Sequence, residues 1–232
     1  MITFTISPEG VAHIQLDDGK ANALTQSCID EALQCIDRAE NEAKVLCISG
    51  RAGRFCAGFD LKVMNKSPQD AVNLLAHGKD LFLRLYMCKL PVIMACTGHA
   101  VAGGALLLLC GDVRIGVDGE FKFGLNEVTL GMPIPLLGVE LARDRLGNGY
   151  LSEGLLLGKM YSPQQARDVG YLDAVVPPEY FQTAVDKVAA QLLSINQFAH
   201  YETKRRLRGR TVTYIEDTFE EDLRAFSGPQ KS

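Results

Sequence analysis

Apolar and polar side chains alternate at the start of the chain. Over residues 2–16 the alternation lies on both sides of Ser7-Pro8-Glu9-Gly10, a segment with the composition of a turn. From Thr25, a candidate N-cap, apolar residues recur every three or four positions, at Ile29, Leu33, Ile36 and Ala39. We therefore expect two strands around a turn, followed by an amphipathic helix that ends near Asn41.

Strands, loops and helices alternate over the next hundred residues. The pattern predicts strands at residues 44–49, 90–96, 113–117 and 120–123. It predicts helices at residues 68–87 and 105–110, and the second is apolar on every side, so it must lie in the core. Glycine-bearing loops separate them at residues 50–58 and 97–104. This order is typical of an α/β fold.

Helical patterns replace strands after Pro135. The expected helices cover residues 136–146, 152–157, 163–169, 178–193, 197–207 and 214–226. We divide the chain into an α/β core, residues 1–175, and a helical C-terminal region, residues 176–232. No low-complexity linker marks a sharp border between them.

Composition and charge narrow the class of protein. The chain has 232 residues, of which 47% are apolar and 22% charged, values typical of soluble globular proteins. The net charge of −4 argues against nucleic acid as a main partner. Its longest apolar stretch, residues 100–110, is about half of the ~20 residues that a spanning helix needs. Met1 leads into a strand without a signal-peptide pattern, so we expect a cytoplasmic protein without a membrane partner.

The cysteines and histidines do not form a metal-binding pattern. The seven cysteines include no C-x-x-C pair, and the chain has only four histidines. We expect reduced, buried thiols and no metal site.

Two glycine-bearing loops, residues 55–61 and 97–104, each follow a buried strand, where main-chain N–H groups can face a ligand. Neither has the glycine and lysine spacing of a phosphate-binding loop. Taken alone, both are compatible with tight turns that bind nothing.

Five segments, taken in order, point to one family. They are residues 18–24 (DGKANAL), 55–62 (FCAGFDLK), 97–104 (TGHAVAGG), 123–127 (FGLNE) and 166–177 (ARDVGYLDAVVP). This set spans nearly the whole chain and resembles the enoyl-CoA hydratase/isomerase family, also called the crotonase family. The resemblance implies a spiral of strand-strand-helix units with a helical C-terminal region that forms trimers, so we expect a homotrimer or a dimer of trimers.

The resemblance also implies roles for the loops. The main-chain N–H groups of Phe59 and Gly103 would hold the thioester oxygen of an acyl-CoA substrate as it gains negative charge. Gly103 would open the apolar helix, at the positive end of its dipole. The implied coenzyme A contacts, besides Phe59 and Gly103, are Lys20, Ala21, Ala57, Asp60, Leu61 and Lys62. Coenzyme A would arrive as part of the substrate, with no metal or redox cofactor.

The acid and base groups depart from the hydratase pattern. Hydratases of the family carry two glutamates; Glu127 matches one, whereas Leu106 stands at the position of the other. One carboxylate can move a proton from C2 to C4 of a 3-enoyl chain and produce the 2-enoyl isomer. Leu106 would also keep the site dry and raise the pKa of Glu127. We therefore expect an enoyl-CoA isomerase with Glu127 as base and acid.

Other interpretations stay open. The enzyme could be a hydratase with its second proton carrier elsewhere, or act on another acyl-CoA as a hydrolase or decarboxylase. A non-catalytic acyl-CoA-binding oligomer is the alternative of another class. Among nearby side chains, we expect a surface position for Glu140, packing for His99 and a loop-stabilising role for Asp60; Lys204 is a candidate for the coenzyme A phosphates.

Overall fold

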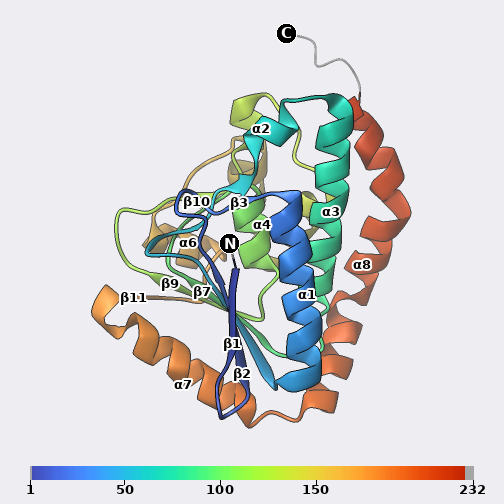
Figure 1. Cartoon of the computed structure of the whole chain (residues 1–232). Coiled ribbons are helices and arrows are strands. Elements are labelled where there is room, and N and C mark those ends of the chain that lie inside the picture. Colours follow the sequence, from blue (N-terminus) through green and yellow to red (C-terminus); the bar gives the residue numbers. More distant parts are fainter. Residues whose placement is uncertain (1, 228–232) are drawn as a thin grey trace.

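The computed structural model describes residues 2–227, with side chains described to residue 224. Figure 1 shows sheets and helices wound into an α/β fold, as the sequence predicts. The largest sheet contains, in spatial order, β1 (Ile2–Ile6), β2 (Val11–Leu16), β4 (Val45–Ser49), β7 (Val92–Cys96), β9 (Val113–Val117) and β11 (Ala174–Val176). Its strands are parallel except β1, which pairs antiparallel with β2.

Shorter strands form two small sheets beside the large one. A three-stranded parallel sheet has the order β10 (Phe123–Gly124), β8 (Gly98–Val101), β5 (Gly53–Cys56). The other sheet pairs β3 (Ala23–Leu24) with β6 (Gly58–Phe59) in parallel.

The main helices are α1 (Gln26–Glu42), α2 (Leu61–Met64), α3 (Pro68–Tyr86), α4 (Gly103–Leu109), α5 (Leu136–Arg145), α6 (Pro163–Val169), α7 (Phe181–Leu193) and α8 (Gln197–Ser227). Short 3-10 turns occur at η1 (Glu127–Leu130), η2 (Asn148–Tyr150) and η4 (Pro178–Tyr180), and η3 (Ser152–Leu156) is a π-helix. As predicted, Thr25 caps α1: its side chain accepts a hydrogen bond from the Cys28 N–H.

The elements repeat in a strand-strand-helix order. A strand of the large sheet, a strand of a small sheet and then a helix follow one another in β4-β5-β6-α2-α3 and again in β7-β8-α4. The next turn of the spiral, β9-β10, continues through η1 into α5. Parallel strands end at the same edge of a sheet. The second strand of each turn of the spiral therefore ends beside the second strand of the next turn.

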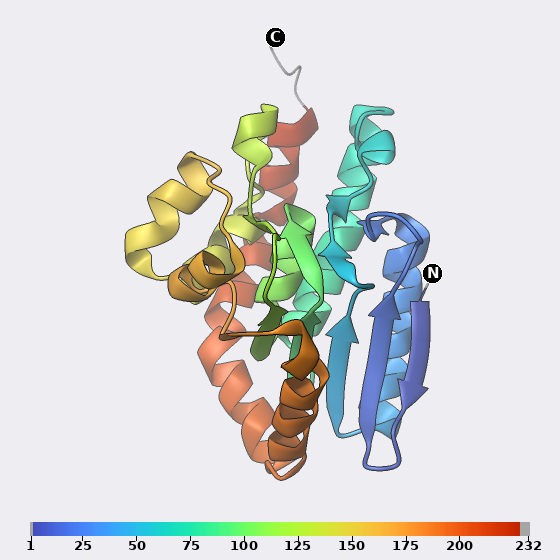
Figure 2. The ribbon, with the colours of Figure 1, turned by 90° about the vertical axis from the view of Figure 1, so that its left-hand side faces the viewer.

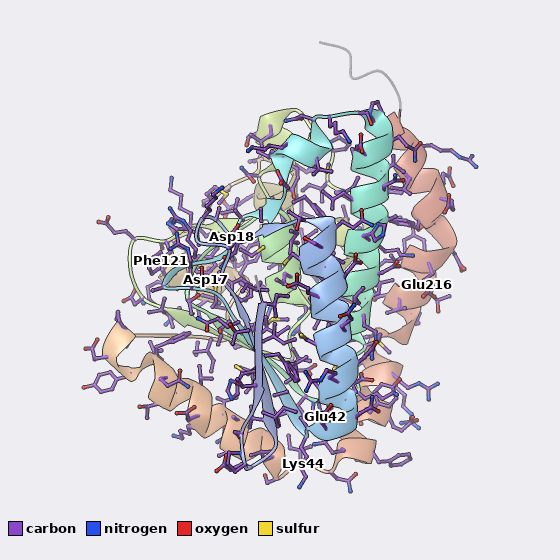
Figure 3. The ribbon with its side chains drawn as sticks, viewed as in Figure 1. Asp17, Asp18, Glu42, Lys44, Phe121 and Glu216 are labelled. Atoms are coloured by element: carbon purple, nitrogen blue, oxygen red, sulfur yellow. The ribbon has the colours of Figure 1, made fainter. Side chains whose placement is uncertain are left out.

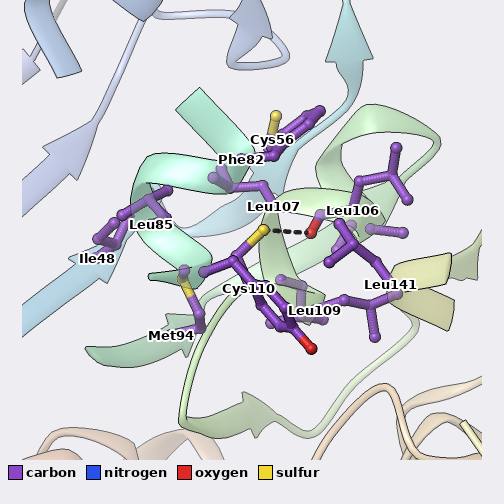
Figure 4. Close-up of a cluster of buried hydrophobic side chains, with 14 of the residues drawn as sticks. Ile48, Cys56, Phe82, Leu85, Met94, Leu106, Leu107, Leu109, Cys110 and Leu141 are labelled. Atoms are coloured by element: carbon purple, nitrogen blue, oxygen red, sulfur yellow. Dashed lines mark hydrogen bonds between the residues drawn. The ribbon is translucent and has the colours of Figure 1, made fainter. Parts of the chain in front are cut away.

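The large sheet is covered on both faces. Helices α1, α3 and α4 lie on one face, and α7 packs on the other, against apolar side chains such as Val45, Ile93 and Ile115 (Figures 1 and 2). Figure 4 shows the main core around α4, where Phe82, Leu107 and Cys110 meet. The Cys110 thiol donates to the Leu106 carbonyl, and the described cysteines are free, six of them buried as expected.

The structure corrects the C-terminal half of the prediction. Strands do not cease at Pro135, because β11 pairs in parallel with β9, and the predicted border between residues 175 and 176 falls within this strand. Asp173 holds the strand in place by accepting hydrogen bonds from the Arg114 main chain and guanidinium. The two helices expected at residues 197–207 and 214–226 form the single helix α8, which continues through Gly209.

Candidate active site

Three turns of the spiral meet at one cavity of about 320 Å³. Strand β6 and the residues that flank it bring Ala57, Phe59 and Leu61 to the cavity wall, and the turn after β8 brings Gly103. The end of β10 brings Glu127. These are the loops that the sequence singled out, and the parallel order of β5, β8 and β10 explains why they lie together.

The β6 strand lies directly against the start of α4. Gly58 has φ +88°, and a Cβ at this position would lie 2.8 Å from the Gly103 nitrogen, so only glycine allows the approach. The Asp60 N–H donates to the Leu24 carbonyl on β3 at 3.1 Å. The Ala57 N–H likewise donates to the Ala21 carbonyl, so the residues on both sides of β6 are held by the segment that contains β3.

The first turn of α4 leaves the Gly103 N–H without a partner inside the helix. The N–H groups of Ala105 and Leu106 both donate to the Ala102 carbonyl. The earlier N–H groups of α4, that of Gly103 among them, have no carbonyl within the helix to which they can donate. Ala102 itself has φ +51°, an uncommon conformation for a residue with a Cβ. Its N–H is held by the Gly124 carbonyl at 2.9 Å, so the β8-β10 pairing fixes this turn.

Glu127 is a buried carboxylic acid in the cavity wall. Glu127 is 8% exposed, and its Oε2 atom is buried without a hydrogen-bond partner among the described residues. Burial raises the pKa of the Glu127 carboxyl to about 7, because an apolar environment disfavours the charged form. Leu106, 2% exposed, lines the same cavity. A carboxyl group with this pKa can both accept and return a proton near neutral pH.

The other predicted coenzyme A contacts lie outside the cavity wall. Lys20 and Lys62 are exposed, while Ala21 and Asp60 are half-buried. The Ala21 carbonyl accepts from the Ala57 N–H at 3.1 Å, which places the Lys20 turn beside the cavity entrance. Asp18 shapes this turn by accepting hydrogen bonds from several of its main-chain N–H groups. Figure 3 shows Asp17 and Asp18 there, far from Glu42 at the end of α1.

Asp60, His99 and Glu140 have structural partners. Asp60 caps α2 by accepting from the Lys62 N–H, as expected for a residue that stabilises its own loop. His99 is packed, as predicted: its ring lies edge-on to Phe121 and its Nδ1 accepts from the Lys122 N–H. Glu140 is half-buried, not at the surface as expected; it forms an ion pair with Arg143 at 3.3 Å and is not among the residues that line the cavity.

The proposed contact between Lys204 and coenzyme A phosphates is wrong within this chain. Lys204 is 4% exposed, and its Nζ donates to the carbonyls of Cys88 and Leu90 and to Asp112. Arg208 pairs with the same Asp112 carboxylate. Lys204 and Arg208, one helical turn apart, face inward and therefore anchor α8 to the core.

Much of the cavity wall comes from residues that no sequence motif marked. They are Met64, Leu75, Leu130, Met132, Pro133 and Pro135. Leu75 lies on α3, the helix over residues 68–87 that the sequence predicts. The others lie at the ends of the short helices α2 and η1 or between η1 and α5, where the path of the chain depends on the packing of distant elements, so only the phase of the α3 pattern could have indicated a wall residue.

The described part of the chain contains neither a membrane-spanning helix nor a metal-binding group. Among residues 2–227, no helix is both long enough and apolar enough to cross a membrane. Within the same residues, no three histidine, cysteine, aspartate or glutamate side chains gather in a group that could hold a metal ion.

Comparison with known proteins agrees with this geometry. The family model of enoyl-CoA hydratase/isomerase matches residues 7–232. The mouse protein named mitochondrial enoyl-CoA delta isomerase 1 is 30% identical over 96% of this chain and 79% of its own. A crystal structure of an enoyl-CoA hydratase/isomerase family protein from Pseudomonas syringae has a TM-score of 0.93 and 40% identity, covering 96% of each chain.

A second solved structure has the same fold at lower identity. The human mitochondrial delta3-delta2-enoyl-CoA isomerase has a TM-score of 0.93 with 28% identity, over 97% of this chain and 90% of that one. Our expectation of a cytoplasmic location stays a prediction, since the mouse and human proteins are named as mitochondrial. With its spiral fold, glycine turns and buried glutamate, the chain belongs to the enoyl-CoA hydratase/isomerase, or crotonase, family and is an enzyme of that family.

Proposed function

We propose that the protein isomerises 3-enoyl-CoA thioesters to 2-enoyl-CoA thioesters, with Glu127 as the single base and acid. The observation that carries the proposal is the composition of the cavity wall. Among the described residues that line the cavity, Glu127 alone has a carboxyl group, and Leu106 provides an apolar surface. The relatives named as isomerases support the same reaction class.

The reaction requires one proton to move between two carbons. Glu127 takes a proton from C2, and the electron pair spreads over the chain to the thioester oxygen as a dienolate. The N–H groups of Phe59 and Gly103 stabilise that oxygen, and each such donor typically contributes ~10²–10³ in rate. Glu127 then returns the proton to C4, so that the double bond ends between C2 and C3. The carboxyl group finishes in its starting state, with no net proton consumed.

The dry wall favours isomerisation over hydration. Hydration needs a water molecule activated on one side of the double bond and a proton delivered to C2, which two positioned groups usually share. In this chain the apolar Leu106 side chain lines the wall beside Glu127. A low-polarity site also strengthens hydrogen bonds to the dienolate oxygen.

A panel of substrates tests the proposal. We expect the native protein to conjugate 3-enoyl-CoA substrates, followed by the increase in absorbance of the conjugated thioester, and to hydrate crotonyl-CoA at least ~10²-fold more slowly, since it lacks a second positioned acid-base group. Hydration at rates similar to isomerisation would instead assign a hydratase. Binding of 2-enoyl, 3-enoyl and 3-hydroxyacyl thioesters without turnover would assign a non-catalytic acyl-CoA binder.

A further inference from the structure

The Phe59 side chain fills a notch in helix α3. Gly78 lies on the buried face of α3, and a Cβ built at this position would collide with the Phe59 ring. On the same helix, the Phe82 ring meets Phe59 edge-on, with 5.9 Å between the ring centroids. The ring of Phe59 is thus held from behind by two positions of α3, one helical turn apart.

The Phe59 ring also separates two cavities. A second, much smaller cavity of about 20 Å³ lies beyond the main one, with room for about one water molecule. Phe59, Leu75, Leu106 and Pro135 line both cavities, so these four side chains form the partition. The far wall of the small cavity comes from α8, through Phe219 and Leu223.

The partition closes the apolar end of the site. Phe219 and Leu223 pack with Leu75 in a small apolar cluster that includes Phe59. Two polar side chains, Lys79 and Asp222, also line the small cavity: Lys79 lies over the Phe219 ring, and Asp222 accepts from the Leu136 N–H. An acyl tail that passed the partition would therefore meet the body of α8 rather than an open channel.

We propose that the Phe59 side chain sets the acyl-chain length that this enzyme accepts, limiting it to short chains. This inference rests on the proposed function, because it takes the main cavity as the place where the acyl chain binds. A longer tail would have to displace the ring, which Gly78 and Phe82 hold in place. Phe59 then has two separate roles, one for its main-chain N–H and one for its side chain.

The test measures binding of saturated acyl-CoA thioesters, which cannot isomerise, by calorimetry. We expect the native protein to bind butanoyl-CoA at least tenfold more tightly than octanoyl-CoA, since a misfit of one methylene alone can cost about tenfold or more. Phe59→Ala should reverse this preference by opening the small cavity. Phe219→Ala alone should leave the preference for butanoyl-CoA unchanged, because the Phe59 ring still closes the main cavity. Phe59→Ala/Phe219→Ala should extend tight binding to decanoyl-CoA.

A second pair of variants tests the notch. Gly78→Ala should push the ring into the main cavity and weaken butanoyl-CoA binding about tenfold, and Gly78→Ala/Phe59→Ala should restore it. Phe121→Ala, which removes a ring packed on His99 that is not part of either cavity wall, is the control for loss of an aromatic side chain.

A native preference for octanoyl-CoA, an unchanged preference in Phe59→Ala, or an equal shift in Phe219→Ala would overturn the proposal. These readouts do not depend on isomerase turnover, so failure of the proposed reaction would be seen separately.

Discussion

The carboxyl group of Glu127 combines burial with an unused acceptor oxygen. Its neighbours in the wall, Leu106 and Met132 among them, offer no charge to stabilise the ionised form. Burial raises its pKa to about 7, whereas an exposed glutamate titrates near ~4.3. A base of this strength is a better proton acceptor than an exposed carboxylate and is still largely ionised just above neutral pH.

The raised pKa predicts the pH dependence of the reaction. Glu127 must be ionised to take the C2 proton, and its ionised fraction falls as the pH drops through the folded-state value. We therefore expect kcat/KM for 3-enoyl-CoA isomerisation to fall about tenfold per pH unit below an apparent pKa near 7. Initial rates between pH 5 and 9 measure this, and a flat profile from pH 5 to 7 would contradict a raised pKa.

At the scale of elements, α8 is attached to the core by a buried ionic cluster. Asp112 accepts from Lys204 at 2.7 Å and from Arg208 at 2.9 Å. Although burial acts in the opposite direction, the His200 imidazole and these two cations hold the pKa of Asp112 well below its usual range. The same Lys204 ammonium donates to the carbonyls of Cys88 and Leu90 in the connection between α3 and β7. Removing one partner would leave charges and carbonyls buried without compensation.

This cluster predicts a large effect of one substitution. Lys204→Met keeps much of the side-chain volume but should lower the free energy of unfolding by about 3–5 kcal/mol, measured by urea denaturation. Arg206→Met is the matched control, because Arg206 is exposed and its ion pair is with Glu202 on the same helix; it should change stability by less than about 0.5 kcal/mol. A Lys204→Met protein as stable as the control would show that the cluster adds little.

Sequence patterns predicted the elements that have a strong period and missed those that depend on distant partners. The α1 and α3 helices and the strands β4, β7 and β9 follow from their apolar spacing. Strand β11 has three half-buried residues and exists because β9 and the Arg114-Asp173 pair hold it. The strand predicted at residues 120–123 overlaps the observed β10 at Phe123 alone, since β10 is set by pairing with β8 and by the antiparallel bridge between Phe123 and Tyr161.

In the site, sequence motifs identify the residues that act in the reaction, whereas the residues that shape the cavity wall depend on tertiary packing. Phe59, Gly103 and Glu127 belong to segments whose residues match a family pattern, so they could be named from the sequence. Leu75 and Pro135 could not, because their place in the wall depends on how α3 and α5 pack across the spiral. The contact between Gly78 and the Phe59 ring could not be predicted for the same reason: a lone glycine in a helical pattern does not show which side chain packs against it.

At the scale of the whole molecule, we predict a trimer or a pair of trimers. Several large apolar side chains stay exposed in the single chain, among them Leu156 and Leu157 at the end of η3 and Phe198 and Leu207 on α8. Groups of exposed apolar residues commonly mark protein-protein interfaces. Light scattering coupled to size exclusion should give three or six times the chain mass of 25.3 kDa. A mass equal to one chain at micromolar concentration would contradict this prediction.

The most direct test of the account is the turnover of Glu127→Gln on a 3-enoyl-CoA, compared with the native enzyme and with Glu140→Gln. The amide keeps the shape of the side chain and cannot accept the C2 proton, so kcat should fall by about 10²–10⁴. Glu140→Gln, outside the cavity wall, should keep a kcat within about twofold of the native value. Native-like isomerisation by Glu127→Gln would contradict the assignment of this carboxyl group as the base and acid.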